Sequence, residues 1–196
     1  MSLSPTPREL QAARTRAELS KAALTLFMAY GIQHVTIDDI CTACGVTKGA
    51  FYYYFPSKDH IIAYSVNHKL DGYLEEHFHF PTSRPAKERL LHLFQMTFSF
   101  FQLLGRPMTR YAYEGQTRSL IELKRPERFY VRLLSAIIQD AKQSNAFRVH
   151  LELDDCYMML IILQTGFLFK WSSTPEELDH RYDWDAILEE MVSSIF

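Results

Sequence analysis

The strongest constraint on the fold of this chain is the placement of three helix-ending residues, Gly31, Gly45 and Pro56. Each one follows a stretch with helical spacing of apolar residues, and glycine or proline at such a point ends a helix. The first stretch is the longest, and the two that follow are short and joined by a tight turn at Gly45. Short helices joined in this way predict a helix-turn-helix.

Capping residues support the same two short helices. Thr36 and Asp39 stand at the spacing of a capping box, with Asp in the place of the usual Glu. Thr47 is expected to cap the third helix, and Val46 and Phe51 occupy the N′ and N4 positions of a hydrophobic staple. Local signals therefore fix where both helices begin.

The third helix is predicted to turn its phenylalanines inward and its tyrosines outward. At 100° per residue, Phe51 and Phe55 share one face. The opposite face carries two minimal side chains and then tyrosines, namely Gly49, Ala50, Tyr52 and Tyr53. Because successive aromatic residues cannot all lie on one side of a helix, burial of the whole run is disfavoured.

Such an outward face suits the groove of a nucleic-acid duplex. Small residues allow close approach of the helix N-terminus, whose unpaired N–H groups and dipole favour phosphate. Tyrosine hydroxyls donate to phosphate oxygens, and Lys48 can reach a guanine edge or a phosphate. Lys58, in the first turn of the next helix, is a further phosphate candidate.

The net charge of the chain argues against a protein that coats nucleic acid without sequence preference. The chain has a formal net charge of -2 and an isoelectric point near 6.4. Its first sixty residues hold six Lys and Arg against five Asp and Glu. A non-specific coat is normally strongly basic, so binding must depend on where the few charges lie.

Residues 36–59 resemble the N-terminal signature of the TetR family of transcriptional regulators. The match runs almost throughout Gly45–Asp59, and residues 15–31 are similar to the first helix of that family. Cys41, Cys44 and Phe51 depart from it, yet each keeps an apolar site. By this resemblance, the DNA-contacting positions are Thr36, Thr47, Lys48, Gly49, Ala50, Tyr52, Tyr53, Tyr54 and Lys58.

The spacing Cys41-x-x-Cys44 is compatible with a metal or redox site and also with two buried structural cysteines. Two thiolates at this spacing could begin a zinc site or form a redox couple. No second pair follows, Cys156 is remote, and both residues face inward in the predicted helix. We expect buried free thiols, no metal and no cofactor.

The rest of the chain predicts an all-α body of larger helices. The expected helices cover residues 57–76, 85–104, 108–119, 126–145, 154–171 and 183–196. We expect a helix-turn-helix DNA-binding domain at 1–56 and a helical effector-binding and dimerisation bundle at 57–196, linked by the helix from about residue 57.

The segment 157–163 is apolar on every side of a helix, so it must be covered all round. A monomer that buries every face internally is one solution. The other is a homodimer, and the resemblance implies that the last two helices form its interface. A dimer also places two recognition helices on a palindrome. The interface candidates are Leu160, Leu163, Phe167, Leu188, Met191 and Ile195.

The middle helices are rich in aromatic residues, which suit a plain core as well as a pocket. The resemblance implies a small effector held between these helices, and an apolar or amphipathic molecule fits their composition. The candidate ligand residues are His92, Phe94, Phe98, Phe101, Tyr111, Glu114 and Gln164.

Several other classes of protein are disfavoured. The sequence contains no recognisable catalytic constellation, so we expect no enzyme. The start of the chain lacks the apolar stretch of a secretory signal. The longest apolar region, Cys156 to Phe169, is interrupted and shorter than the ~20 residues that span a bilayer. We therefore expect a soluble, cytoplasmic protein without a membrane partner.

Two functions remain from these observations. The first is a repressor that binds a palindromic operator in double-stranded DNA as a homodimer and is released by a small-molecule effector. The second is a DNA-bound structural or partner-recruiting protein with the same N-terminal domain and no ligand response.

Overall fold

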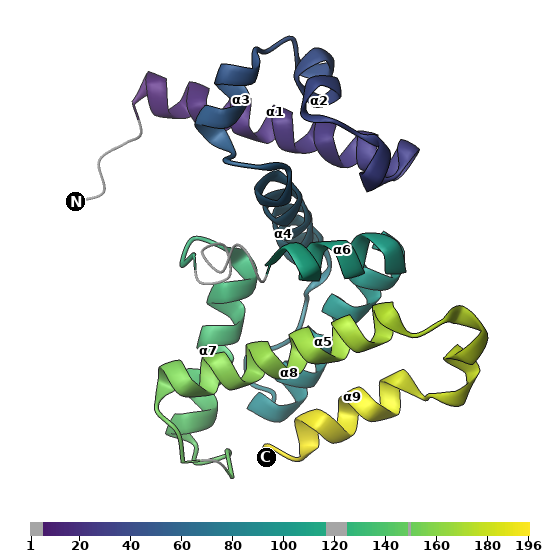
Figure 1. Ribbon diagram of the computed structural model, residues 1–196. Coiled ribbons are helices and arrows are strands. Elements are labelled where there is room, and N and C mark those ends of the chain that lie inside the picture. Colours follow the sequence, from purple (N-terminus) through teal and green to yellow (C-terminus); the bar gives the residue numbers. More distant parts are fainter. Residues whose placement is uncertain (1–5, 117–124, 149) are drawn as a thin grey trace. The chain divides into compact units, whose positions relative to one another are not determined.

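The computed structural model describes residues 6–116, 125–148 and 150–196, which divide into two compact units (Figure 1). The first unit, here called the head, extends to Asn67, and the second, the body, begins at His68. The division between the units falls within the helix Lys58–His77, eleven residues after the predicted boundary at residue 56. Every regular element in the described ranges is a helix, so the all-α prediction is confirmed.

The described part of the head up to Asn67 contains three α-helices, a 3-10 helix and the start of a fourth α-helix. Its elements are α1 (Pro7–Tyr30), the short 3-10 helix η1 (Ile32–His34), α2 (Ile37–Cys44), α3 (Lys48–Tyr54) and the first part of α4 (Lys58–His77). The apolar pattern from Leu19 onward indicated only the second half of α1. No described side chain before Leu19 is buried, so apolar spacing carried no signal for the first half. Pro7 suits the first helical position, where its missing N–H costs nothing.

Aromatic side chains form the core of the head behind α3. Phe51 and Phe55 are fully buried, with ring centroids 5.9 Å apart. The Phe55 ring lies 5.3 Å from that of Tyr64 on α4. The Arg16 guanidinium of α1 sits 4.0 Å from the centre of the Tyr64 ring, a cation–π contact. These contacts fix the inner face of α3 and thereby its orientation.

The body is a bundle of helices with the predicted order. Its elements are the rest of α4, then α5 (Ala86–Leu104), α6 (Arg106–Gln116), α7 (Phe129–Gln143), α8 (Leu153–Ser173), the 3-10 helix η3 (Glu176–Arg181) and α9 (Trp184–Ser193). Most predicted ends are correct within a few residues. The two 3-10 helices were missed, because each is too short to show an apolar period.

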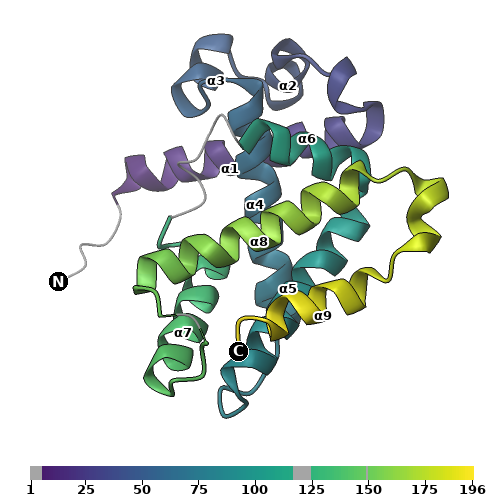
Figure 2. The same cartoon turned by 60° about the horizontal axis from the view of Figure 1, so that its bottom comes forward.

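The helices α5 and α8 form the centre of the body. α5 packs against α7, α8 and α9, and α8 also packs against α7 and α9 (Figure 2). Phe98 of α5 meets Phe167 and Trp171 of α8 edge to face, at centroid distances of 5.0 and 5.3 Å. Such pairs add to the free energy gained by burying the rings. The aromatic stripe of α5 therefore serves the core of the subunit.

This packing divides the predicted dimer residues into two groups. Leu160, Phe167, Leu188 and Ile195 are buried inside the single chain, while Leu163 and Met191 are half-buried. A side chain that is already covered loses little further surface to a partner. Three exposed apolar residues of α8 share another face, namely Met158, Ile162 and Phe169. The all-round apolar pattern was recognised, but it did not reveal which face turns inward.

Two glycines of the head are expected to respond oppositely to alanine. Gly45 has φ of +64°, so Gly45→Ala should lower the free energy of unfolding by about 1–2 kcal/mol. Gly49 lies inside α3, and an added Cβ would meet nothing closer than the Thr47 hydroxyl at 3.8 Å. Gly49→Ala should therefore raise the free energy of unfolding by about 0.5–1 kcal/mol. Urea denaturation followed by circular dichroism measures both, and equal effects would contradict the assigned backbone geometry.

Candidate nucleic-acid interface

The turn between α2 and α3 is set by one glycine and two caps. Gly45 adopts the left-handed conformation that ends α2, and the Val46 N–H donates to the Cys41 carbonyl at 3.0 Å. At the start of α2, the Thr36 N–H donates to Asp39 Oδ2 at 2.8 Å, and the Asp39 N–H donates to Thr36 Oγ1 at 3.2 Å. The capping box predicted from the sequence is confirmed. The backbone N–H of Thr36 lowers the pKa of the Asp39 carboxyl.

The helix α3 has a buried side and an exposed side. Thr47 caps it by accepting the Ala50 N–H at 3.2 Å. Tyr52 and Tyr53 are 51% and 75% exposed, while Phe51 and Phe55 lie behind them in the core. The orientation that helical spacing predicts is therefore confirmed. A face of glycine and tyrosines is presented to solvent.

The predicted DNA-contacting residues differ in accessibility. Those with exposed side chains or backbone are Thr36, Thr47, Lys48, Gly49, Tyr52 and Tyr53. Ala50, Tyr54 and Lys58 are half-buried. The Tyr54 ring makes an edge-on contact with that of Tyr53, at a centroid distance of 4.9 Å. Tyr54 thus supports the ring of its more exposed neighbour.

Lys48 is the cation of α3, and it is paired with a carboxylate that sequence reasoning overlooked. Its ammonium lies 2.9 Å from Asp38 Oδ2, and both side chains are largely exposed. The hydrogen bond to Asp38 raises the pKa of Lys48. A phosphate that reaches Lys48 must therefore compete with Asp38. The sequence placed Asp38 in the first turn of α2 but gave no sign that it faces α3.

Lys58 is engaged inside the head. Its ammonium donates to the Ile32 carbonyl and lies 5.7 Å from the centre of the Phe27 ring. Burial lowers the pKa of Lys58. The side chain ties α4 to the segment after α1, so a direct phosphate contact would require this hydrogen bond to break.

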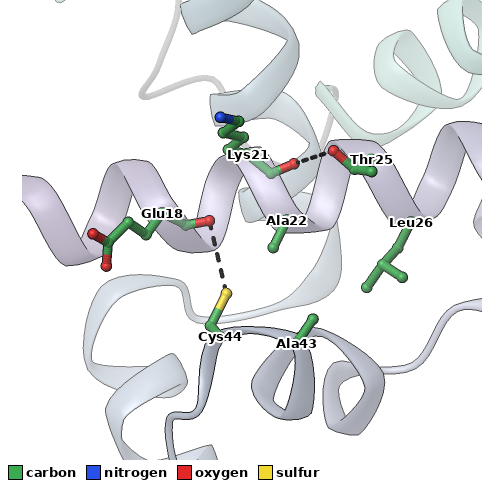
Figure 3. Close-up of a pocket in the computed structure, with 7 residues that line it drawn as sticks. All are labelled: Glu18, Lys21, Ala22, Thr25, Leu26, Ala43 and Cys44. Atoms are coloured by element: carbon green, nitrogen blue, oxygen red, sulfur yellow. Dashed lines mark hydrogen bonds between the residues drawn. The ribbon is translucent and has the colours of Figure 1, made fainter.

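A groove of about 490 Å³ lies between α1 and α2 (Figure 3). Its lining residues are Glu18, Lys21, Ala22, Thr25, Leu26, Ala43 and Cys44. Cys44 is only half-buried here, which corrects the prediction that both cysteines are buried. Its thiol donates to the Glu18 carbonyl at 3.7 Å. Burial raises the pKa of the Cys41 and Cys44 thiols, which disfavours the thiolate form.

The head matches the family model of the bacterial regulatory proteins of the tetR family over residues 19–64. That stretch contains the whole arrangement described above, from the core of α1 through α3 to the start of α4. The head is therefore a DNA-binding domain of the TetR type.

Similarity to individual family members is strongest in the head. The chain is 24% identical over 157 residues to the HTH-type transcriptional repressor KstR2 of Mycolicibacterium smegmatis, covering 76% of both chains. It is 40% identical over 48 residues to the probable acrEF/envCD operon repressor of Escherichia coli K12, covering 24% of this chain and 22% of that one. It spans 50% of ArpR, a probable HTH-type transcriptional regulator of Pseudomonas putida.

Two solved structures share the fold over most of the chain. Thermus thermophilus FadR in complex with lauroyl-CoA has a TM-score of 0.63 and 22% identity, covering 91% of both chains. RolR in complex with resorcinol has a TM-score of 0.57 and 18% identity, covering 93% of this chain and 89% of that one. At these identities the likeness concerns the fold.

The family match of the head and the regulators that the chain resembles identify a DNA-binding transcriptional regulator. The relatives are regulators and not enzymes, in agreement with the sequence-based expectation. In the part of the chain that the structure describes, no helix is long and apolar enough to cross a bilayer.

Neutralising Asp38 should strengthen DNA binding. Asp38→Asn frees Lys48 and removes a negative charge beside α3, so affinity for duplex DNA should rise roughly two- to fivefold. Fluorescence anisotropy with a labelled duplex from the chain's own upstream region measures the change at low and high salt. Glu18→Gln is the matched control, since Glu18 is an exposed acid of the head that pairs with Arg14. An unchanged affinity in Asp38→Asn would mean that Asp38 does not compete with DNA for Lys48, and a weakened affinity would mean that the pair positions Lys48 on DNA.

Proposed function

We propose that this chain is a homodimeric repressor that holds a palindromic operator and releases it when a small molecule binds the body. The observation that carries the proposal is the division of α3 into a buried phenylalanine face and an exposed tyrosine face. A short helix anchored from behind, with its first residues and two tyrosines exposed, suits the major groove. A regulator of this kind meets DNA in the cytoplasm, where we expect it to act.

Contacts to phosphate would come from hydroxyl groups and backbone more than from charge. Lys48 is the cation that α3 contributes, while Tyr52 and Tyr53 present exposed phenols. Tyrosine O–H groups and helix N-terminal N–H groups position a protein on the duplex. Gly49 leaves room for the backbone to approach the base edges. One head offers few such contacts, so two heads on one operator are favoured.

The proposed partner for dimerisation is a second copy, docked on an apolar stripe of α8. The stripe consists of Met158, Ile162 and Phe169, with the half-buried Met159 and Leu163 beside it. Exposed Ile187 and half-buried Met191 extend the apolar surface on α9. A symmetric dimer buries such a stripe against itself, and it sets two recognition helices one DNA turn apart, about 34 Å.

Release by an effector requires that the effector bind one arrangement of the heads more tightly than the other. The fold neighbours FadR and RolR were solved with small molecules bound, which supports a ligand-responsive body here. Among the candidate ligand residues, Phe94, Phe98, Phe101 and Gln164 are buried, His92 and Tyr111 are half-buried, and Glu114 is exposed. The buried members are better placed than Glu114 to meet an apolar effector.

The full packing of Phe94, Phe98 and Phe101 also suits a body that binds no ligand. In that case the protein would act as a DNA-bound structural or partner-recruiting factor. Operator binding that no metabolite, drug or lipid weakens would favour this second function.

Removing the outward side chains of α3 should weaken operator binding. Tyr53→Ala and Lys48→Ala should each reduce affinity on the order of tenfold to a hundredfold, because a dimer loses each phosphate hydrogen bond twice. Lys48→Ala should also flatten the dependence of binding on salt. Gel-shift titration of upstream DNA measures both, with Tyr182→Ala, an exposed tyrosine of the body, as control. Unchanged binding by both α3 variants would refute the assigned DNA-binding face.

A charge in the α8 stripe should split the dimer. Ile162 is 61% exposed in the single chain, so Ile162→Glu should leave its fold intact while burying an unpaired charge in the proposed interface. Size-exclusion chromatography with light scattering should give the 22.9 kDa mass for the variant and twice that for the natural chain. Leu103→Glu on α5, where Leu103 is 74% exposed, is the control and should stay dimeric. A natural chain that runs as a monomer would exclude this interface.

A further inference from the structure

The interior of the body contains a polar cluster that joins α4, α7 and α8. Its members are Asp71 on α4, Arg128 just before α7, Tyr130 on α7 and Gln164 on α8. Arg128 and Gln164 are buried, and Tyr130 is 4% exposed. Polar groups at such depth are normally fully hydrogen-bonded. The hydrogen bonds of this cluster are complete in one half and incomplete in the other.

The charged half is complete. Arg128 Nε donates to Asp71 Oδ2 at 3.0 Å, and Arg128 Nη2 donates to Asp71 Oδ1 at 3.3 Å. The Tyr130 backbone N–H donates to the same Oδ1 at 3.0 Å. The carboxylate therefore accepts three hydrogen bonds, and the two charges compensate each other. This half offers no spare charge to a further group.

The neutral half is incomplete. The Tyr130 hydroxyl donates to Gln164 Oε1, which joins α7 to α8. The amide nitrogen Nε2 of Gln164 is buried and has no hydrogen-bond partner among the described residues, and the residue is only 6% exposed. An amide that loses its hydrogen bonds to water and gains none in the protein destabilises the fold. Gln164 thus holds a donor that nothing in the described body uses.

The tyrosine side chains around this cluster supply hydrogen-bond donors and carry no negative charge. Burial raises the pKa of Tyr113, Tyr130 and Tyr157, so all three remain O–H groups. The Tyr113 ring lies 5.4 Å from that of Phe101, at the boundary between the polar cluster and the aromatic core of α5. The surroundings of Gln164 are therefore rich in donors, partly aromatic and neutral overall.

We propose that the Gln164 amide binds the effector, and that the effector is a neutral, mostly apolar small molecule with a carbonyl oxygen. The inference rests on the proposed effector response and specifies its chemistry. A carbonyl supplies the acceptor that Nε2 lacks, and the apolar remainder of the molecule matches the neighbouring aromatic side chains. A carboxylate is disfavoured, because Arg128 is already neutralised and a second anion would be buried without a counterion.

Three matched probes test this chemistry on the full-length protein. Acetophenone carries a carbonyl, ethylbenzene has nearly the same shape without an acceptor, and benzoate carries a charge. At millimolar concentration acetophenone should raise the melting temperature on the order of 1–3 °C. Ethylbenzene and benzoate should raise it less. Equal shifts with acetophenone and ethylbenzene would overturn the proposal.

The double variant Tyr130→Phe/Gln164→Leu assigns the effect to this site. It replaces both hydrogen-bonding partners with apolar groups of similar shape, which leaves neither one unpaired. Without any probe, it should melt at the same temperature as the natural chain or higher. It should also lose the difference between acetophenone and ethylbenzene. A difference that persists in a folded double variant would place the carbonyl elsewhere and refute the role of Gln164.

Operator binding separates this inference from the proposed function. The double variant leaves the head unchanged, so its operator affinity without a probe should match that of the natural chain. If neither protein binds the operator, the proposed function fails while the melting comparison still decides the ligand chemistry. If both bind and acetophenone shows no advantage, the ligand chemistry alone is wrong.

Discussion

The DNA-binding capacity of this protein depends on the packing of Phe51 and Phe55 behind α3. The helix is too short to be stable alone, so its position comes from burying these two rings against the core of the head. Because the rings fix the rotation of α3, they also decide that Tyr52 and Tyr53 face solvent. The caps at Thr36 and Thr47 set where the short helices start. The aromatic anchor sets which way α3 faces.

Charge plays a smaller part in this head than geometry. Lys48 is restrained by Asp38, and Lys58 is turned inward to the Ile32 carbonyl. A single head therefore presents little uncompensated positive charge, which limits non-specific attraction to DNA. Hydroxyl groups and the helix N-terminus need a defined approach to the duplex, and a symmetric pair of heads would supply it. A small uncompensated charge fits a regulator that binds particular DNA sequences and dissociates from them.

The helix α8 serves several purposes on its different faces. Its inner face packs Phe167 and Trp171 against α5. Its exposed face carries Ile162, where we propose that a second copy docks. On the same inner face, Gln164 holds a polar group in the interior. A ligand at Gln164 would contact the same helix that carries the proposed dimer contact. A small shift of α8 on ligand binding would then change the distance between the two heads of a dimer.

The amino-acid sequence was enough to predict the local features of the head: the turn at Gly45, both helix caps, and the inward and outward faces of α3. These depend on backbone conformation and on neighbours a few residues apart, which the order of residues records directly. The tertiary structure decided the rest. It showed that Leu160 and Phe167 are core and Ile162 is exposed, that Asp38 holds Lys48, and that Gln164 keeps an unused donor. Such contacts join residues distant in the chain, and an apolar helix has no polar face from which its buried side could be recognised.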